Sequence, residues 1–261
     1  MSTSLTKEVL SANELTSHRA NKLARGFTLL ELLIVISIIA ILSVILIVAL
    51  NPAETLKKAR DTQRISDLAS LKTALGIYIT TTTSSATNLG LAGTNLCRDE
   101  SSKGIYYSIG NDTTSGGTGI HEQIGDTGLD GTTGITVGQV TDANLGLIAG
   151  TGWVPVNLSG LTGGSPISNM PIDPINTIAD TTAYSAGTVP TVYSADKVYR
   201  YACKQSNLTF EIDATLESTA FTSTDDKRAK DGGNSTLMYE VGTDLTILGA
   251  NNASSGNAAA F

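Results

Sequence analysis

One carboxylate lies near the start of a long apolar run in this chain. The run extends from Phe27 to Leu50, and Glu31 is its only charged residue. A charge inside a membrane span costs roughly 3 kcal/mol on insertion scales, so it is rare unless another group compensates it. As a helix the run would be about 36 Å long, enough to cross a hydrocarbon core of about 30 Å. Either the run does not span a membrane, or the Glu31 carboxylate has a partner.

Two cysteines, Cys97 and Cys203, are further groups that could form a covalent or metal site. They could form a disulfide, remain as two thiols or take part in a metal site. No C-x-x-C spacing and no neighbouring histidine accompany them, which argues against zinc. Both cysteines follow the apolar run, and in an oxidising compartment outside the membrane we expect a disulfide that closes a long loop.

The remaining residues show little sign of a catalytic site. The two histidines, His18 and His121, lie before the apolar run and in a Gly-rich stretch, and neither is placed for a nucleophile–histidine pair. No H-E-x-x-H, Walker or dinucleotide motif occurs. The formal net charge of −7 argues against a general nucleic-acid binder. We therefore expect no enzyme, no cofactor and no direct contact with nucleic acid.

The residues before the apolar run form a basic leader. Residues 1–26 contain four lysines and arginines against two glutamates, which is typical of a segment kept on the cytoplasmic side of a membrane. A secretory signal peptide has a shorter apolar region of roughly 7–15 residues and a small-residue cleavage site, and this run is longer and lacks a clean A-x-A. A plain membrane anchor fits the length but leaves Glu31 unexplained. A third interpretation places a cut before the run.

The stretch RGFTLLE, residues 25–31, resembles the processing site of type IV prepilins and type II secretion prepseudopilins. In that family a prepilin peptidase cuts after the glycine, and the new N-terminal residue is N-methylated. The resemblance implies a cut between Gly26 and Phe27, methylation of Phe27, and Glu31 as the fifth mature residue. The new α-amine would be a cation one helical turn from Glu31, or could meet Glu31 of a neighbouring subunit. In the family this glutamate aids subunit entry into a growing filament.

A second helix is predicted directly after the apolar run. Asn51 suits an N-cap and Pro52 the first helical position, and Pro52 predicts a kink or a locally unwound turn. Apolar residues then recur at helical spacing as far as residue 79, which predicts one face for packing against a head domain. Asp61 and Arg64, at i and i+3, are expected on the opposite, solvated face. The resemblance makes the two helices one continuous rod.

The rest of the chain predicts a head of antiparallel strands. The clearest strand-like runs are KGIYYSIG, TGWVPVNLS, KVYRYACKQSNLTFEIDATLE, TLMYEVG and DLTIL, of which the third predicts a hairpin. The stretch MPIDPIN, residues 170–176, resembles the turn before the terminal sheet of major pseudopilins. The predicted fold is therefore α+β, with a long N-terminal helix packed on an antiparallel β-sheet head, as in pilins.

These patterns divide the chain into four parts. They are a cytoplasmic leader (1–26), a transmembrane and filament-core helix (27–50), an amphipathic helix that continues into the head (51–80), and the head itself (81–261). A Gly- and Thr-rich stretch at about residues 110–150 is interpreted as a surface insertion in the head.

A calcium site in the head was considered because some major pseudopilins bind calcium in a C-terminal loop. Four aspartates fall in the corresponding stretch here: Asp225, Asp226, Asp231 and Asp244. Their spacing does not match an EF-hand loop. A solvated acidic loop is the favoured interpretation, and the four are only weak candidates for calcium.

The sequence therefore predicts a structural filament subunit of a type IV pilus or a type II secretion-like pseudopilus. Before assembly it would be a single-pass protein of the bacterial inner membrane, in contact with lipid and with its leader in the cytoplasm. Afterwards it would form an extracytoplasmic, cell-surface filament. The resemblance implies further copies of the chain, prepilin peptidase, the inner-membrane assembly platform and minor pilins as partners. A DNA-uptake filament stays open, and the alternative from another class is a membrane-anchored adhesin or binding module that does not polymerise.

Overall fold

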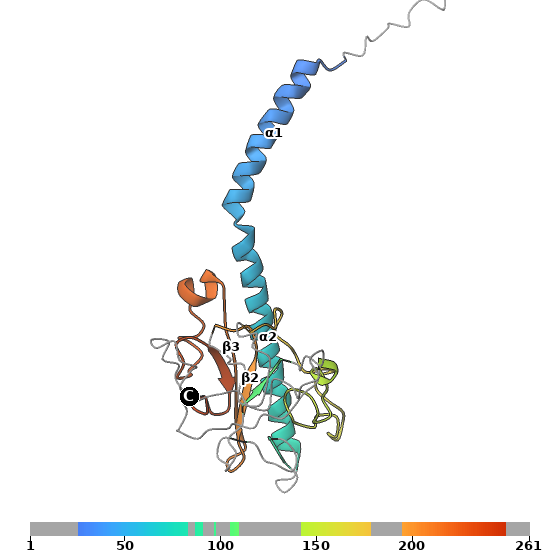
Figure 1. The fold of residues 1–261 in the computed structure, drawn as a ribbon, viewed down its shortest axis with the longest axis vertical. Coiled ribbons are helices and arrows are strands. Elements are labelled where there is room, and N and C mark those ends of the chain that lie inside the picture. Colours follow the sequence, from blue (N-terminus) through green and yellow to red (C-terminus); the bar gives the residue numbers. More distant parts are fainter. Residues whose placement is uncertain are drawn as a thin grey trace, which may run out of the picture. The chain divides into compact units, whose positions relative to one another are not determined.

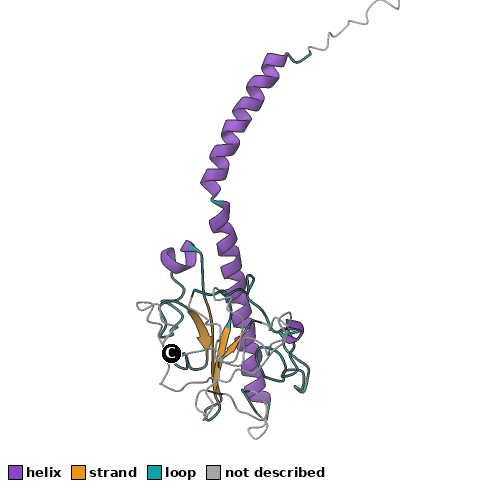
Figure 2. Cartoon of the chain, in the orientation of Figure 1, coloured by secondary structure: helices purple, strands orange, loops and turns teal. Residues whose placement is uncertain are grey.

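A computed structural model describes residues 26–82, 87–90, 97, 105–109, 142–178 and 195–248 (Figure 1). The chain divides into two compact units, with the boundary between Asn51 and Pro52. The first unit contains helix α1, and the second contains helix α2 and a four-stranded antiparallel sheet (Figure 2). These elements confirm the predicted α+β class.

Helix α1 spans Leu29–Leu50 and consists almost entirely of aliphatic residues. Its N-cap is Thr28, whose hydroxyl oxygen accepts a hydrogen bond from the N–H of Glu31 at 3.2 Å and satisfies one free donor of the first turn. The hydroxyls of Ser37 and Ser43 donate to backbone carbonyls of the preceding turn, at 2.7 Å each. Because these hydroxyls bond within the helix, they suit an apolar environment.

The first helix ends at the predicted break. Asn51, which was expected as an N-cap, takes the left-handed conformation with φ 39° and is the C-cap of α1. Asparagine tolerates this conformation better than most residues. Helix α2 spans Pro52–Thr81, and its first position suits proline because an N–H there would have no helical partner. Because Pro52 has no N–H to donate to the preceding turn, the two helices are separate elements, with the break where the proline predicted it.

Helix α2 buries one face within the head. Its buried apolar residues, which follow the predicted spacing, are Leu68, Leu71, Ala74, Leu75 and Tyr78. Asp61 and Arg64 lie on this buried face with no exposed surface, so their predicted place on a solvated face was wrong. Charged residues are almost never buried unless they are paired; these two pair with each other, and Arg64 also pairs with Asp173 and Glu217, which lie far away in the sequence.

The four strands follow chain order in the sheet, and every neighbouring pair is antiparallel. They are Tyr106–Tyr107 (β1), Arg200–Lys204 (β2), Thr209–Ala214 (β3) and Tyr239–Gly242 (β4). Strands β2 and β3 form the predicted hairpin, in which Tyr201 lies opposite Ile212 and Cys203 opposite Phe210.

Successive side chains of each strand point to opposite faces of the sheet. On the inner face, Tyr201 and Phe210 join the main core with the buried side of α2. The irregular segment 142–178 adds further side chains to this core, including the buried Trp153. On the outer face, Ala202 joins a smaller cluster with Leu248 near the C-terminal end of the described chain.

Two predicted strands are irregular in the structure. The run TGWVPVNLS is largely buried but takes part only in an isolated bridge, between Ala149 and Asn157. The run DLTIL forms turns because the N–H groups of Ile247 and Leu248 both donate to the Glu211 carboxylate instead of to a strand. Most of the predicted insertion, residues 110–141, lies outside the described residues; the rest begins with a short 3₁₀ turn, Asp142–Asn144.

Candidate processing and assembly site

The predicted cleavage site lies directly before α1. Gly26 and Phe27 have no regular secondary structure, and both are exposed. A Cβ added to Gly26 would meet no atom within 4 Å in the described part of the chain. Packing within the described residues therefore does not require glycine at this position.

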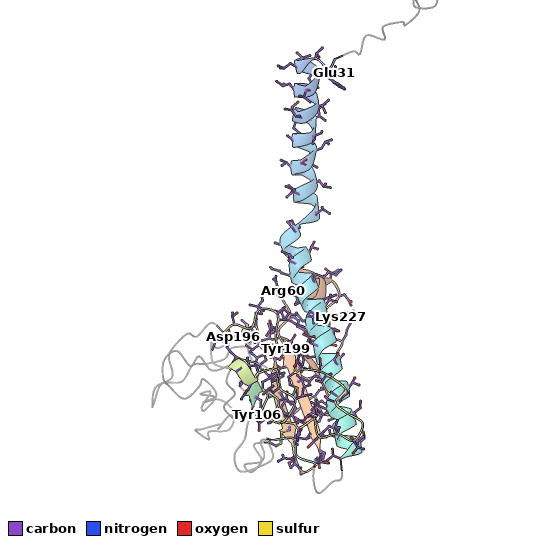
Figure 3. The ribbon with its side chains drawn as sticks, turned by 90° about the vertical axis from the view of Figure 1, so that its right-hand side faces the viewer. Glu31, Arg60, Tyr106, Asp196, Tyr199 and Lys227 are labelled. Carbon is purple, nitrogen blue, oxygen red and sulfur yellow. A yellow bond between two sulfur atoms is a disulfide. The ribbon has the colours of Figure 1, made fainter. Side chains whose placement is uncertain are left out.

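Glu31 lies in the first turn of α1, with its side chain exposed (Figure 3). A negative charge there complements the positive end of the helix dipole. Residues 26–50 contain no lysine, arginine or histidine, so this segment gives the carboxylate no cationic side chain. A cut between Gly26 and Phe27 would create an amine four residues before Glu31, on the same helix face if the helix continued to the new terminus.

The apolar side chains of α1 have almost no cover within the described chain. Exposed fractions of its large residues range from 46 % at Val35 to 81 % at Leu29. The helix is long and apolar enough to cross a membrane between Leu29 and Val48, and none of this window is buried. Exposed apolar area costs about 25 cal/mol per Å² in water, so this helix requires lipid or other protein around it.

In the second unit, a buried ion network fixes α2 to two distant segments. The guanidinium of Arg64 donates to both carboxylate oxygens of Asp173, at 2.7 and 2.9 Å, and to Asp61 and Glu217, at 2.8 Å each. Asp173 belongs to the MPIDPIN turn, and Glu217 follows β3. A hydrogen bond from Arg60 lowers the pKa of Glu217 to about 2, and hydrogen bonding to Arg64 adds to the effect. Both arginines therefore hold Glu217 in its charged form.

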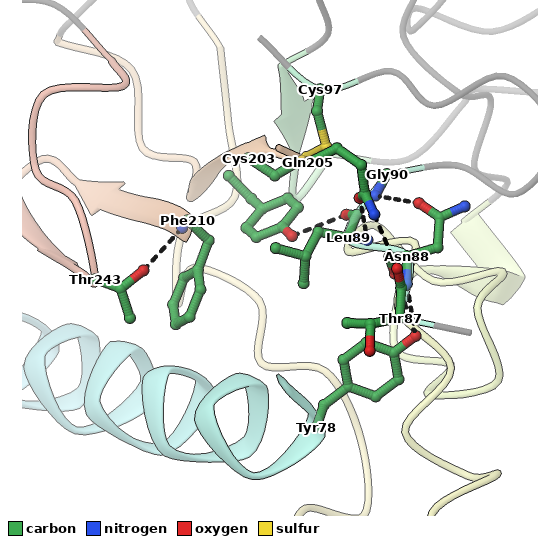
Figure 4. Close-up of a disulfide and its surroundings, with 11 residues drawn as sticks. Tyr78, Thr87, Asn88, Leu89, Gly90, Cys97, Cys203, Gln205, Phe210 and Thr243 are labelled. Carbon is green, nitrogen blue, oxygen red and sulfur yellow. Dashed lines mark hydrogen bonds between the residues drawn. A yellow bond between two sulfur atoms is a disulfide. The ribbon is translucent and has the colours of Figure 1, made fainter. Parts of the chain in front are cut away.

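A disulfide joins Cys97 to Cys203 on strand β2, with Cα atoms 4.8 Å apart (Figure 4). Next to it, Gln205 donates to the carbonyl of Thr87 at 2.8 Å and accepts from the N–H of Leu89 at 3.1 Å. The disulfide closes a separation of 106 residues, which contributes up to about 4–5 kcal/mol in the chain-entropy model. Together these bonds fasten the chain after α2 to the central hairpin.

Comparison with known families bears on the first unit. The family model for the prokaryotic N-terminal methylation motif matches residues 21–47. The chain carries the prepilin-type motif of type IV pilins and pseudopilins. The match includes Gly26, Phe27, Glu31 and most of α1, and it implies processing by prepilin peptidase and pilus-type assembly. No curated protein and no solved structure matches the chain.

The prepilin-type motif bears on the role of α1. In combination with the uncovered apolar surface of this helix, it indicates membrane anchoring. The family of proteins that carry this motif is structural and not enzymatic.

The four aspartates that are candidates for calcium have other partners in the structure. Asp225 and Asp226 pair with basic side chains of their own loop. Asp231 accepts backbone N–H groups, and Asp244 pairs with Lys204 at 2.9 Å. Among the residues that the structure describes, no group of three or more acidic, histidine or cysteine side chains is placed to hold a metal ion.

Sequence reasoning missed two features of the structure. The N-cap Thr28 has a local pattern, because a threonine three residues before Glu31 matches the T-x-x-E spacing of a capping box. The Arg64 network has no local pattern, since its partners Asp173 and Glu217 lie 109 and 153 residues further along. A neighbouring opposite charge, Asp61, indicated only an ordinary surface pair.

Proposed function

We propose that this chain is the structural subunit of a type IV pilus or of a type II secretion-like pseudopilus. Prepilin peptidase would cut after Gly26, Phe27 would be N-methylated, and the subunits would polymerise through α1. One observation carries the proposal: the methylation motif lies on a helix whose apolar surface is uncovered and whose single charge, Glu31, is in the first turn.

The cut would create the cation that Glu31 lacks in the segment around it. Before assembly, the amine of Phe27 and the carboxylate of Glu31 could meet in one subunit near the membrane surface. In a filament, the amine of an entering subunit could meet Glu31 of its neighbour among packed apolar helices. A buried polar pair in an apolar seam fixes register, because every other alignment leaves a charge unpaired.

The proposal assigns a role to each part of the chain. Residues 1–26 would be the cytoplasmic leader, residues 27–50 the membrane span and later the filament core, and residues 81–261 the head on the filament surface. Asn51 and Pro52 would separate the span from the helix that continues into the head. The partners would be further copies of the chain, prepilin peptidase, the assembly platform, minor pilins and, before assembly, inner-membrane lipid.

Replacement of the carboxylate tests the proposal. In cells that contain the assembly machinery, Glu31→Val should be cleaved normally but should yield at least about tenfold fewer filaments, because the interaction that brings the subunit into register is gone. Filaments are counted by electron microscopy, and cleavage is measured as the loss of the leader mass. Ser37→Val is the matched control, since the Ser37 hydroxyl bonds only to a carbonyl of its own helix and lies on the same span.

Normal filaments from Glu31→Val would contradict the proposed role of this residue. A wild-type chain that is cleaved and stays in the membrane without forming filaments would instead favour the anchored adhesin or binding module.

A further inference from the structure

Three carboxyl groups are buried on the outer face of the sheet. Glu211, Asp213 and Glu240 have exposed fractions of only 0, 2 and 1 %. They come from neighbouring strands, and Asp213 lies directly opposite Glu240 across β3 and β4. On the other side of Asp213, strand β2 supplies Arg200, whose guanidinium lies 3.4 Å from the Asp213 carboxylate. The outer face of these strands thus carries three buried carboxyl groups and one guanidinium, which contacts Asp213.

Glu211 holds the end of the described chain against the sheet. One of its carboxylate oxygens, Oε2, accepts the N–H groups of Ile247 and Leu248 at 2.8 Å each. These residues join the outer cluster with Tyr107 and Ala202. The other oxygen, Oε1, is buried and has no hydrogen-bond donor in the structure. A buried charged oxygen without a donor is costly, so a further group is needed at this position.

Glu240 is enclosed by the loop that precedes β4. Its Oε2 accepts the N–H of Ser235 at 2.8 Å. A Cβ added to Gly233 would lie 1.9 Å from the same oxygen, which shows how closely the loop backbone approaches it. The backbone N–H of Glu240 donates to Asp231 on this loop, so the loop brings a further acid toward the strand.

We propose that Glu211 and Glu240 share one proton in the folded head, and that this proton fastens residues 244–248 to the outer face of the sheet. Two carboxylates only accept hydrogen bonds, so they can bond to each other only when a proton lies between them. The proposal rests on contacts inside the head and does not depend on the proposed function.

The surrounding charges favour retention of the proton. Burial raises the pKa of Glu211, and hydrogen bonding to the Glu240 carboxyl raises it further. Burial also raises the pKa of Glu240, and it raises the pKa of Asp213 to about 7 although Arg200 opposes the rise. Lys204, the other basic residue of strand β2, pairs with Asp244 within residues 244–248.

The shared proton makes the fastening sensitive to pH in one direction. A carboxyl group whose pKa is higher in the folded state stabilises that state at low pH, and the contribution is lost as pH rises toward the folded value. Ionisation of Asp213 near pH 7 adds a negative charge opposite Glu240 and acts in the same sense. Residues 244–248 should therefore loosen first as the solution becomes alkaline.

Hydrogen exchange on the full chain in detergent micelles tests this inference. The measurement compares protection factors of the amides of Ile247 and Leu248 between about pH 6 and about pH 9, after correction for the intrinsic exchange rate. In the wild type, protection should fall roughly tenfold across this interval, the loss expected for one hydrogen bond. In Glu211→Gln it should stay constant, since the amide oxygen can still accept both N–H groups while its NH₂ replaces the proton toward Glu240.

Two further variants serve as a control and as an alternative to Glu211→Gln. Asp225→Asn removes a partly exposed acid from the preceding loop and should keep the wild-type pH dependence. If Glu211→Gln does not fold, Glu240→Gln places the permanent donor on the other partner and should give the same constant protection. Equal loss of protection in wild type and in the folded Gln variant would overturn the proposal. Protection of the wild type that depends on added calcium would also overturn it, because a cation would then occupy the place of the proton.

Discussion

Helices α1 and α2 are separated only by Asn51, yet their side chains differ in composition and in burial. Helix α1 exposes large aliphatic side chains along its whole length and has one charge, Glu31. Helix α2 is mostly polar, and it buries Asp61 and Arg64 together with its apolar residues. The buried groups of α2 are paired within its own chain, whereas the side chains of α1 have almost no cover among the described residues.

Because of this difference, we expect α2 to matter for the folding of the head and α1 for assembly. The head is fastened within one chain by the Arg64 network, the disulfide and the apolar core. Helix α1 contributes an uncovered apolar surface, which lipid or other copies must cover. Changes in α2 should therefore alter the stability of the head, and changes in α1 should alter membrane insertion and assembly.

The largest effect is expected at the centre of the α2 network. Arg64→Met would leave Asp61 and Asp173 buried without their cation, which typically costs about 3–5 kcal/mol in the free energy of unfolding. Urea titration of the full chain in micelles, followed by tryptophan fluorescence, measures the change. Lys72→Met on the exposed face of the same helix is the control and should shift stability by no more than about 0.5 kcal/mol. Equal stability of both variants would show that the ion network does not hold α2.

A charge in the middle of α1 should impair membrane insertion and leave the stability of the head unchanged. Ile38→Lys places an ammonium in the span at a cost of about 3 kcal/mol for insertion, while the urea midpoint of the head should not change. The fraction of protein retained in membranes after alkaline extraction should fall roughly tenfold or more, and Ile38→Leu should behave as wild type. A variant that stays in the membrane but unfolds more easily would show that α1 is covered within its own chain.

The smallest effect concerns the acid end of the pH range. Glu217 has an ordinary pKa of 4.5 that falls to about 2 in the folded head, so its contribution is present above the higher value and is lost as pH falls toward the lower one. Glu217→Gln should reduce the slope of the unfolding free energy against pH in this interval. The reduction should be less than roughly 1.4 kcal/mol per pH unit, which is the slope for the uptake of one full proton. The unfolding free energy of both proteins between these pH values measures the difference, and identical slopes would show that the Arg60 and Arg64 contacts do not matter for the charge of Glu217.

Local patterns in the sequence predicted most of the first unit. Apolar length, the basic leader and the spacing from Gly26 to Glu31 are all contiguous, so the span and the motif could be recognised from a short stretch. The break before Pro52 and the β2–β3 hairpin were predicted for the same reason, since a proline and a turn act on their immediate neighbours.

The sequence could not reveal features that depend on distant partners. Asp61 and Arg64 resemble a surface pair until Asp173 and Glu217 are brought to them by the fold. The run DLTIL has the composition of a strand, but the Glu211 carboxylate, 36 residues earlier, takes the N–H group of Ile247. Burial of a charge is decided by such tertiary contacts, which helical or strand periodicity does not encode.

We propose that α1 becomes the filament core only after a cut before it. Mass spectrometry of the N-terminal peptide from sheared surface filaments tests this most directly. The claim predicts filaments built from this chain whose subunits begin at N-methylated Phe27 and retain Glu31. Filament subunits that retain the leader, or that begin beyond Leu50 and so lack α1, would contradict it.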